Sequence, residues 1–267
     1  MPILSTKRVA LLAITLTVLG IIVYKSTYKK TEIPLVTAPI IEEIVAVRPA
    51  KEILGKSAEG RNIEAYNFGT GKTHVVFVGG IHGGYEWNSV LLAYAFIDYL
   101  STHPEIVPKN LTIEVIPSAN PDGVYRVTKK EGRFSKEDVS LDETVLASGR
   151  FNGNDVDLNR NFDCDWKAEG TWQTKTVSGG TEAFSEPESK AIKNYTEKNK
   201  LSGVVVWYSA AGGVFASNCH NGVSTATKAM TKTFADASGY PASQSFDFYA
   251  TTGDMVNWLA KNNVPAI

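Results

Sequence analysis

The chain has 267 residues, of which 43% are hydrophobic and 10% aromatic, so it can bury a full core and a disordered protein is excluded. Its 27 Lys and Arg residues nearly balance 28 Asp and Glu residues, giving a formal net charge of −1. This balance argues against a dedicated nucleic-acid-binding protein, which would carry a basic domain. Two cysteines are too few for a cysteine-rich zinc module or a disulfide scaffold.

The first 30 residues are strongly basic. They hold five basic residues and no acid, so the remainder carries 22 basic and 28 acidic residues, or −6. The basic residues bracket an apolar run at 9–24, which is slightly shorter than the ~20 residues that span a bilayer as a helix. KSTYKK follows the run and no Ala-x-Ala pattern does, so we predict an uncleaved signal-anchor at 1–30 that places the rest of the chain outside the cytoplasm. The alternatives are a cleaved signal of a secreted protein and a buried core helix.

Residues 31–53 are predicted to form an extended linker after this membrane helix. Pro34, Pro39 and Pro49 interrupt short apolar pairs and acids there, and this pattern opposes regular helix. Residues 54–267 contain no repeats or low-complexity tracts. We therefore predict one domain over 54–267.

The predicted domain alternates strand-like and helix-like segments. Apolar, strand-like runs lie at 73–81, 111–117 and 203–209, and the first and third suit strands that are buried on both faces. Apolar residues at helical spacing predict a helix at 87–100. A capping box at Ser185–Glu188, with Pro187 in the first turn, predicts a second helix that runs to about residue 198. The alternation predicts an α/β sheet covered by helices, with functional residues just past the strand ends.

The strongest local motif, GGIHGGYE at 79–86, follows the first predicted strand. It places His82 and Glu86 where a helix begins. Imidazole nitrogen and carboxylate oxygen are both zinc ligands, and a catalytic zinc takes three protein ligands and keeps one open position. The glycines would let the backbone bend so that both side chains reach one ion. The alternative is a glycine-rich turn with a capping His and a Glu at a helix N-terminus.

A second cluster, GRFNGNDVDLNRNF at 149–162, combines two arginines with asparagines and glycines. A planar guanidinium holds a carboxylate through two parallel hydrogen bonds, and a neighbouring Asn can donate a third. The alternative for Arg150 and Arg160 is an ordinary surface salt bridge. The cluster strengthens the prediction of a functional site around His82.

Together, five segments in this order resemble the zinc metallocarboxypeptidases of the carboxypeptidase A family, in a bacterial form. The segments are HGGYEWN, GRFN…VDLNRNF, SGG…FSEPE, WYSAAGG and Tyr249…TGDMVNW, and the similarity covers roughly residues 54–267. The resemblance implies a carboxypeptidase-like domain: a mixed, mostly parallel twisted sheet with helices on both faces. It also implies one zinc ion as cofactor.

The resemblance assigns a role to each matching residue of the reaction centre. His82 and Glu86 match the first two zinc ligands, and Arg150 matches the arginine that polarises the scissile carbonyl. Zinc would lower the pKa of its bound water towards ~7. Arg150 would meet the charge that develops on the tetrahedral intermediate.

Substrate binding is implied for further positions. Asn159 and Arg160 match the pair that binds the terminal carboxylate of the substrate, and Tyr249 matches the mobile tyrosine that closes over it. Asp254 lies near the region that lines the specificity pocket in the family. A carboxylate there would favour a C-terminal Lys or Arg, whereas its apolar neighbours would favour large apolar residues, and both preferences stay open.

Two departures from the family pattern concern the metal. In the family, two residues usually separate the first two zinc ligands, but three residues separate His82 and Glu86. The additional residue is a glycine, which the turn can accommodate. Tyr208 stands where the family has its third ligand, a His, and a phenol with a pKa near ~10 is a poor ligand. We therefore expect weakly bound zinc. His220, twelve residues beyond Tyr208, is not expected to replace the missing ligand, and His74 and His103 are expected to be structural or on the surface.

A third departure concerns the carboxyl end of the sequence. The family's general-base Glu lies on a strand a few residues beyond a segment like the one that ends at Ile267, and a last strand and helix accompany it. We expect an incomplete gene product or a truncated chain with little or no peptidase activity. A degenerate homologue is the alternative.

The two cysteines, Cys164 and Cys219, would both lie near the rim of the site if the fold is as the resemblance implies. An oxidised pair is then expected outside the cytoplasm. Two free buried thiols are the alternative.

Three functions remain open at this point. The first is a membrane-tethered zinc carboxypeptidase that acts on peptides or cell-wall peptides with a free C-terminal carboxylate. The second is a deacylase of N-acyl amino acids, which has a similar zinc site, although the Arg–Asn pair and Tyr249 favour the peptidase. The third is a binding module that holds peptide C-termini without cutting them, which Tyr208 and the missing Glu favour.

Overall fold

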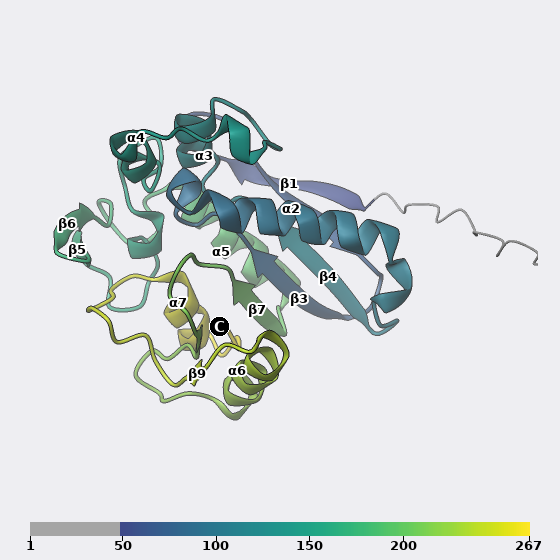
Figure 1. The fold of residues 1–267 in the computed structure, drawn as a ribbon. Helices are drawn as coiled ribbons and strands as arrows, with labels where there is room; N and C mark the ends of the chain where they lie inside the picture. Colours follow the sequence, from purple (N-terminus) through teal and green to yellow (C-terminus); the bar gives the residue numbers. More distant parts are fainter. Residues whose placement is uncertain (1–48) are drawn as a thin grey trace, which may run out of the picture. The chain divides into compact units, whose positions relative to one another are not determined.

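The fold is seen in a computed structural model that describes residues 49–267 (Figure 1). The predicted membrane segment at 1–30 and linker residues 31–48 lie outside the described residues. Within residues 49–267, no helix combines the length and the apolar character needed to cross a membrane.

Strands and helices alternate along the described part of the chain. The strands are β1 (Ala50–Lys56), β2 (Asn62–Phe68), β3 (Thr73–Val78), β4 (Leu111–Ile116), β5 (Glu169–Trp172), β6 (Lys175–Ser178), β7 (Gly203–Val206), β8 (Val214–Phe215) and β9 (Ala242–Ser243). The α-helices are α2 (Trp87–Thr102), α3 (Pro121–Thr128), α4 (Glu143–Ser148), α5 (Pro187–Asn199), α6 (Thr225–Ser238) and α7 (Met255–Lys261). Short 3-10 turns include η1 (Gly83–Glu86) and η4 (Leu158–Arg160).

The central sheet has five strands in the order β1-β2-β4-β3-β7. The pairs β1–β2 and β2–β4 are antiparallel, whereas β3 pairs in parallel with both β4 and β7. An isolated parallel bridge between Val204 and Ala266 extends the parallel side beyond β7. The mixed sheet that the resemblance implies is therefore confirmed, and its parallel part contains the three strands predicted from apolar runs.

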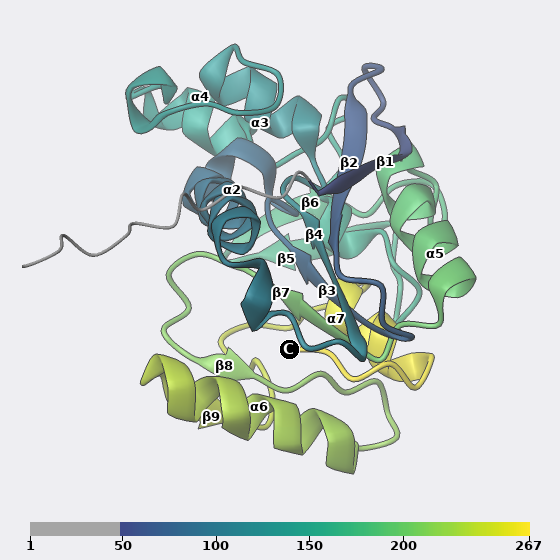
Figure 2. The ribbon, with the colours of Figure 1, turned by 90° about the vertical axis from the view of Figure 1, so that its right-hand side faces the viewer.

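Helices cover both faces of the sheet, as expected, and each face has its own apolar core. Figure 2 shows α2 on one side of the strands and α5 on the other. On the α2 face, Val90, Ala93 and Ile97 pack at helical spacing against Val115 of β4. On the other face, residues of α5 and α7 pack against β2, β3, β4 and β7. Burying two separate apolar faces stabilises the sheet in its layered arrangement.

Some boundaries differ from the predictions. Strand β1 begins at Ala50, inside the segment predicted as linker. The capping box predicted at Ser185 does not form, because Glu186 is the N-cap residue of α5 and Ser185 donates its hydroxyl hydrogen bond to the Glu186 carboxylate at 2.8 Å. The Glu188 carboxylate instead accepts from the backbone N–H of Ala58 at 3.0 Å. Tertiary partners therefore replace the local cap.

The parallel strands bring their carboxyl ends to one edge of the sheet. The chain leaves β3 at Gly79 and Gly80, whose carbonyls accept from the N–H groups of Ala119 and Asn120 after β4, both at 3.0 Å. The N–H of Trp207, after β7, donates to Val78 O at 2.8 Å. The segments that follow β3, β4 and β7 are thus fixed side by side, where a parallel sheet places its functional residues.

Candidate active site

His82 and Glu86 flank the 3-10 turn that follows β3. Their side chains are buried, with 4% and 5% exposure of the residues, and His82 Nδ1 lies 3.0 Å from Glu86 Oε1. Both ring nitrogens of His82 and Glu86 Oε2 lack hydrogen-bond partners among the described residues. Zinc–ligand distances of about 2.0–2.1 Å give a tetrahedral edge of about 3.3 Å, close to the observed separation. Two free donors therefore converge where one small cation would fit.

Four glycines hold this turn against the segments that carry the other site residues. A Cβ at Gly83 would lie 2.5 Å from Gly149 O, and one at Gly84 would lie 2.6 Å from Gly123 O. A Cβ at Gly123 would lie only 2.2 Å from Gly149 O. Because side chains would push these backbones apart, the glycines set the approach of η1, α3 and the segment that begins at Arg150.

Asp157 is a buried aspartate for which the sequence predicted no role. It lies between His82 on one segment of the site and Arg150 and Asn159 on another. Its carboxylate accepts from Arg150 Nε at 2.8 Å and from Asn159 N at 3.0 Å, and Oδ1 lies 3.8 Å from His82 Nε2. Burial alone would raise the pKa of Asp157, but the guanidinium charges of Arg150 and Arg160 and the hydrogen bond from Arg150 lower it below its ordinary value. Asp157 thus stays ionised and orients the guanidinium of Arg150, while its Oδ1 faces the imidazole of His82 without a hydrogen bond.

Arg150 is 1% exposed, and its guanidinium lies 4.7 Å from the ring of Trp172. Its Nη2 has no hydrogen-bond partner among the described residues. An unpartnered donor on a buried cation is costly unless a ligand uses it. The arrangement suits a group that accepts charge-assisted hydrogen bonds, as a developing oxyanion does.

Asn159 and Arg160 lie on η4, next to Asp157. Asn159 Oδ1 accepts from Met255 N at 3.0 Å, and no described residue accepts from its Nδ2. Arg160 is 1% exposed and donates to Asn159 O and to Thr171 O. Three of its five N–H groups are used in this way, so two remain for a substrate carboxylate.

Tyr249 lies over Arg160, with 5.9 Å between the guanidinium carbon and the centre of the ring. The ring also contacts Phe246 at 5.0 Å between centroids. The ring of Tyr249 is therefore close to the guanidinium that would hold a substrate carboxylate. This position agrees with the covering role that the resemblance implies.

Tyr208 follows β7, and its ring centre lies 5.6 Å from that of His82. Its hydroxyl donates to Asn159 Oδ1 over a long 3.4 Å. Burial, together with the nearby carboxylates of Asp254 and Glu86, raises the pKa of Tyr208 well above its ordinary value. The phenol is therefore neutral and directed towards Asn159.

Comparison with known proteins assigns the family. Residues 47–265 match the sequence model of the zinc carboxypeptidases, peptidase family M14. The chain belongs to this family.

Two relatives and one solved structure illustrate the similarity. Zinc carboxypeptidase A 1 of Anopheles gambiae is 28% identical over an alignment of 225 positions, and the match covers 76% of this chain and 50% of that protein. Gamma-D-glutamyl-L-diamino acid endopeptidase 1 of Lysinibacillus sphaericus is 25% identical over an alignment of 221 positions, and the match covers 74% of this chain and 54% of that protein. The murein-tripeptide amidase MpaA of Escherichia coli O157 superposes with a TM-score of 0.61 at 21% identity, covering 83% of this chain and 82% of that chain. The chain thus spans about half the length of these curated relatives.

Zinc is the cofactor of a zinc carboxypeptidase, and the donors of this chain fit it in part. His82 and Glu86 offer the buried, unpartnered atoms that a metal needs. Tyr208 is near them but neutral, so it is a poor third ligand. The other histidines are engaged elsewhere, as predicted: His74 with Glu114 and His220 with Asp165, while His103 lies beside the Tyr99 carbonyl. The site therefore supplies two good protein ligands instead of three.

Three other predicted residues, Asp254 and the two cysteines, make structural contacts. Asp254 is 4% exposed and is the N-cap of α7, accepting from Asn257 N at 3.0 Å and from Asn257 Nδ2 at 2.8 Å. Each of its oxygens accepts one hydrogen bond within the helix cap, and its predicted place near the specificity pocket stays a prediction. Cys164 and Cys219 form a disulfide with a Cα–Cα distance of 6.2 Å, so the expected oxidised pair is confirmed.

Proposed function

We propose that this protein is a zinc-dependent carboxypeptidase that removes C-terminal amino acids from peptides, including cell-wall peptides, outside the cytoplasm. One observation carries the proposal. His82 and Glu86 on the turn after β3, and Arg150 on a segment far along the chain, each place a buried polar atom without a partner at the same edge of the sheet. Such atoms are uncommon in folded proteins, and a cluster of them is typical of a ligand site.

The residues divide the chemistry of peptide-bond hydrolysis. When bound, zinc supplies an activated water and polarises the scissile carbonyl. Arg150 Nη2 would donate to the carbonyl oxygen as it becomes an oxyanion, and Asp157 keeps the guanidinium in place. Asn159 Nδ2 and the two remaining N–H groups of Arg160 would hold the terminal carboxylate, so the enzyme would act on the last residue of the chain.

The substrate class and the location rest on further observations. The Lysinibacillus relative is named for a bond to a diamino acid, which supports a cell-wall peptide as one substrate. The disulfide between Cys164 and Cys219 supports an oxidising compartment. The signal-anchor proposed at residues 1–30 would hold the domain at the outer face of a membrane.

The test compares two forms of one peptide. The full chain is incubated with zinc and with a peptide that carries either a free C-terminal carboxylate or an amide, and the products are identified by mass spectrometry. We expect slow loss of single C-terminal residues from the acid only, because Tyr208 leaves the zinc with two good protein ligands. Arg150→Ala should lower the rate by about 10²–10³-fold, whereas Arg133→Ala, which removes an exposed ion pair with Asp98, should not. Equal cleavage of acid and amide would refute a carboxypeptidase.

A second candidate function is a protein that binds peptide C-termini without cutting them, and Tyr208 favours it. A neutral phenol in the third-ligand position weakens the metal, while Asn159 and Arg160 keep free donors for a carboxylate. Calorimetry would then detect binding of the acid peptide and none of the amide, with intact peptide recovered afterwards. Recovery of cleaved acid peptide would exclude this candidate.

A further inference from the structure

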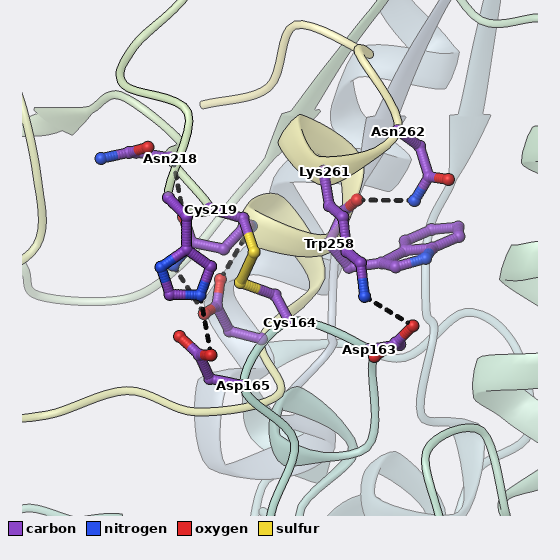
Figure 3. The surroundings of a disulfide bond; sticks show 11 residues. Asp163, Cys164, Asp165, Asn218, Cys219, Trp258, Lys261 and Asn262 are labelled. Carbon is purple, nitrogen blue, oxygen red and sulfur yellow. Dashed lines mark hydrogen bonds and ion pairs between the residues drawn. A yellow bond between two sulfur atoms is a disulfide. The ribbon is translucent and has the colours of Figure 1, made fainter.

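A second group of metal ligands lies outside the site, at the disulfide. The Sγ atoms of Cys164 and Cys219 and a ring nitrogen of His220 all lie within 4.8 Å of one another. His220 Nε2 also lies 2.8 Å from Asp165 Oδ1. Figure 3 shows Asp165 beside the disulfide. Two sulfurs, an imidazole and a carboxylate are thus gathered in one place, and this is a donor set that zinc accepts.

Other contacts hold the two segments together, so the group does not depend on the disulfide alone. Cys164 O accepts from Gly253 N at 2.7 Å. Next to Cys219, Asn218 N donates to Asn257 Oδ1 at 2.8 Å, on helix α7. Both cysteine-bearing segments are therefore tied to the segment around α7. Reduced thiols would remain near their present positions.

The surroundings suit an ion that enters from solvent. Both cysteines are buried, with 4% and 6% exposure, whereas the side chains of His220 and Asp165 are 70% and 53% exposed. The sulfurs would form the inner side of the site and the imidazole its outer side. Zinc–sulfur bonds of about 2.3 Å imply a sulfur–sulfur separation of about 3.8 Å, which side-chain rotation of the two free cysteines can reach.

We propose that reduction of the Cys164–Cys219 disulfide creates a second zinc site, formed by both thiolates and His220, with Asp165 as the fourth donor. A dithiol reductant supplies two electrons and two protons, so the disulfide becomes two thiols and the reductant becomes a disulfide. Binding of Zn²⁺ then displaces one proton from each thiol. In its oxidised form the protein has no thiolate to offer, so this site exists only after reduction.

Cobalt reports on such a site directly. Co²⁺ replaces zinc in thiolate sites and gives an intense sulfur-to-metal charge-transfer absorption in the near ultraviolet, which ligands from His82 and Glu86 cannot produce. The full chain is titrated with Co²⁺ before and after treatment with a dithiol, followed by removal of the reductant under anaerobic conditions. We expect the band only in the reduced protein, at about one equivalent, and its loss when Zn²⁺ is added.

Variants separate this site from the active site and from binding by the cysteines alone. Cys219→Ser should abolish the band, His220→Ala should weaken cobalt binding by ~10-fold or more, and His103→Ala, a histidine remote from the group, should leave it unchanged. His82→Ala should keep the band. Absence of the band in reduced wild-type protein, whether folded or unfolded by circular dichroism, would overturn the proposal. So would equal cobalt affinity in His220→Ala and wild type.

Discussion

Replacing Asp157 with Asn should destabilise the protein strongly, because it leaves Arg150 as a buried cation without its counterion. Asp157 is fully buried and Arg150 is 1% exposed, with 2.8 Å between Oδ2 and Nε. The amide of the Asn variant has one oxygen in place of two. If its NH₂ group faces Arg150, two donors oppose each other, and if it faces Asn159 N, that hydrogen bond is lost instead. Breaking one partner of a buried ion pair typically costs about 3–5 kcal/mol, and we expect a loss of that size in the free energy of unfolding.

Urea unfolding at neutral pH measures this loss, and Asp155→Asn is the matched control. Asp155 lies in the same segment, but its side chain is 80% exposed, and its φ of +56° suits Asn. The control should change stability by less than about 0.5 kcal/mol. The pKa of Asp157 is lowered, so its contribution is present above the ordinary value of 3.8 and is lost as the pH falls through the lower folded pKa. Equal midpoints for both variants would refute the reasoning.

Three further changes test the site and its surroundings. Tyr208→His should raise the zinc retained after dialysis, measured by elemental analysis, because an imidazole would supply the third ligand; unchanged zinc would mean that position 208 is not at the metal. Gly170→Ala should raise the KM for acid peptides by ~10-fold, because the new Cβ would lie 2.7 Å from Arg160 Cδ and displace the guanidinium; an unchanged KM would contradict this. Burial raises the pKa of Glu188 from 4.5 to about 7, so its contribution to stability is complete below 4.5 and is lost as the pH rises through about 7. Urea unfolding of the wild type should therefore show up to about 3 kcal/mol lost between about pH 5 and pH 8, and a Glu188→Gln variant that shows the same loss would exclude this residue as its source.

The parts of the fold that the sequence predicts well are those whose hydrophobic pattern is complete. Strands β3, β4 and β7 and helix α2 lie within one to three residues of their predicted bounds. Strands β1 and β2 were missed because they pair at the outer side of the sheet and mix charged with apolar residues. The cap of α5 was predicted wrongly because the carboxylate of Glu188 finds tertiary partners, which no local pattern reveals.

In the candidate site, too, local motifs could be predicted and tertiary contacts could not. His82, Glu86, Arg150 and Asn159 were named from motifs, and the structure brings them together. The linking role of Asp157 was not predicted, because its contact with His82 joins segments far apart in the sequence. The depth at which Arg160 is buried is likewise a product of tertiary packing.

The sequence contains a signal for the capping role of Asp254. The pattern Asp-x-x-Asn before an apolar helical run predicts an N-cap, as observed for α7. The place near the specificity pocket that the resemblance implies for Asp254 stays a prediction.

Asn159 Oδ1 accepts hydrogen bonds from both the hydroxyl of Tyr208 and the backbone N–H of Met255. With the proposed roles of Tyr208 and Asn159, metal affinity and recognition of the substrate's end would be coupled through one amide group. A lineage that exchanged His for Tyr at position 208, or the reverse, would alter both properties in one step. Substitutions at 208 and 159 should accordingly show strong epistasis, and their evolutionary histories should be correlated.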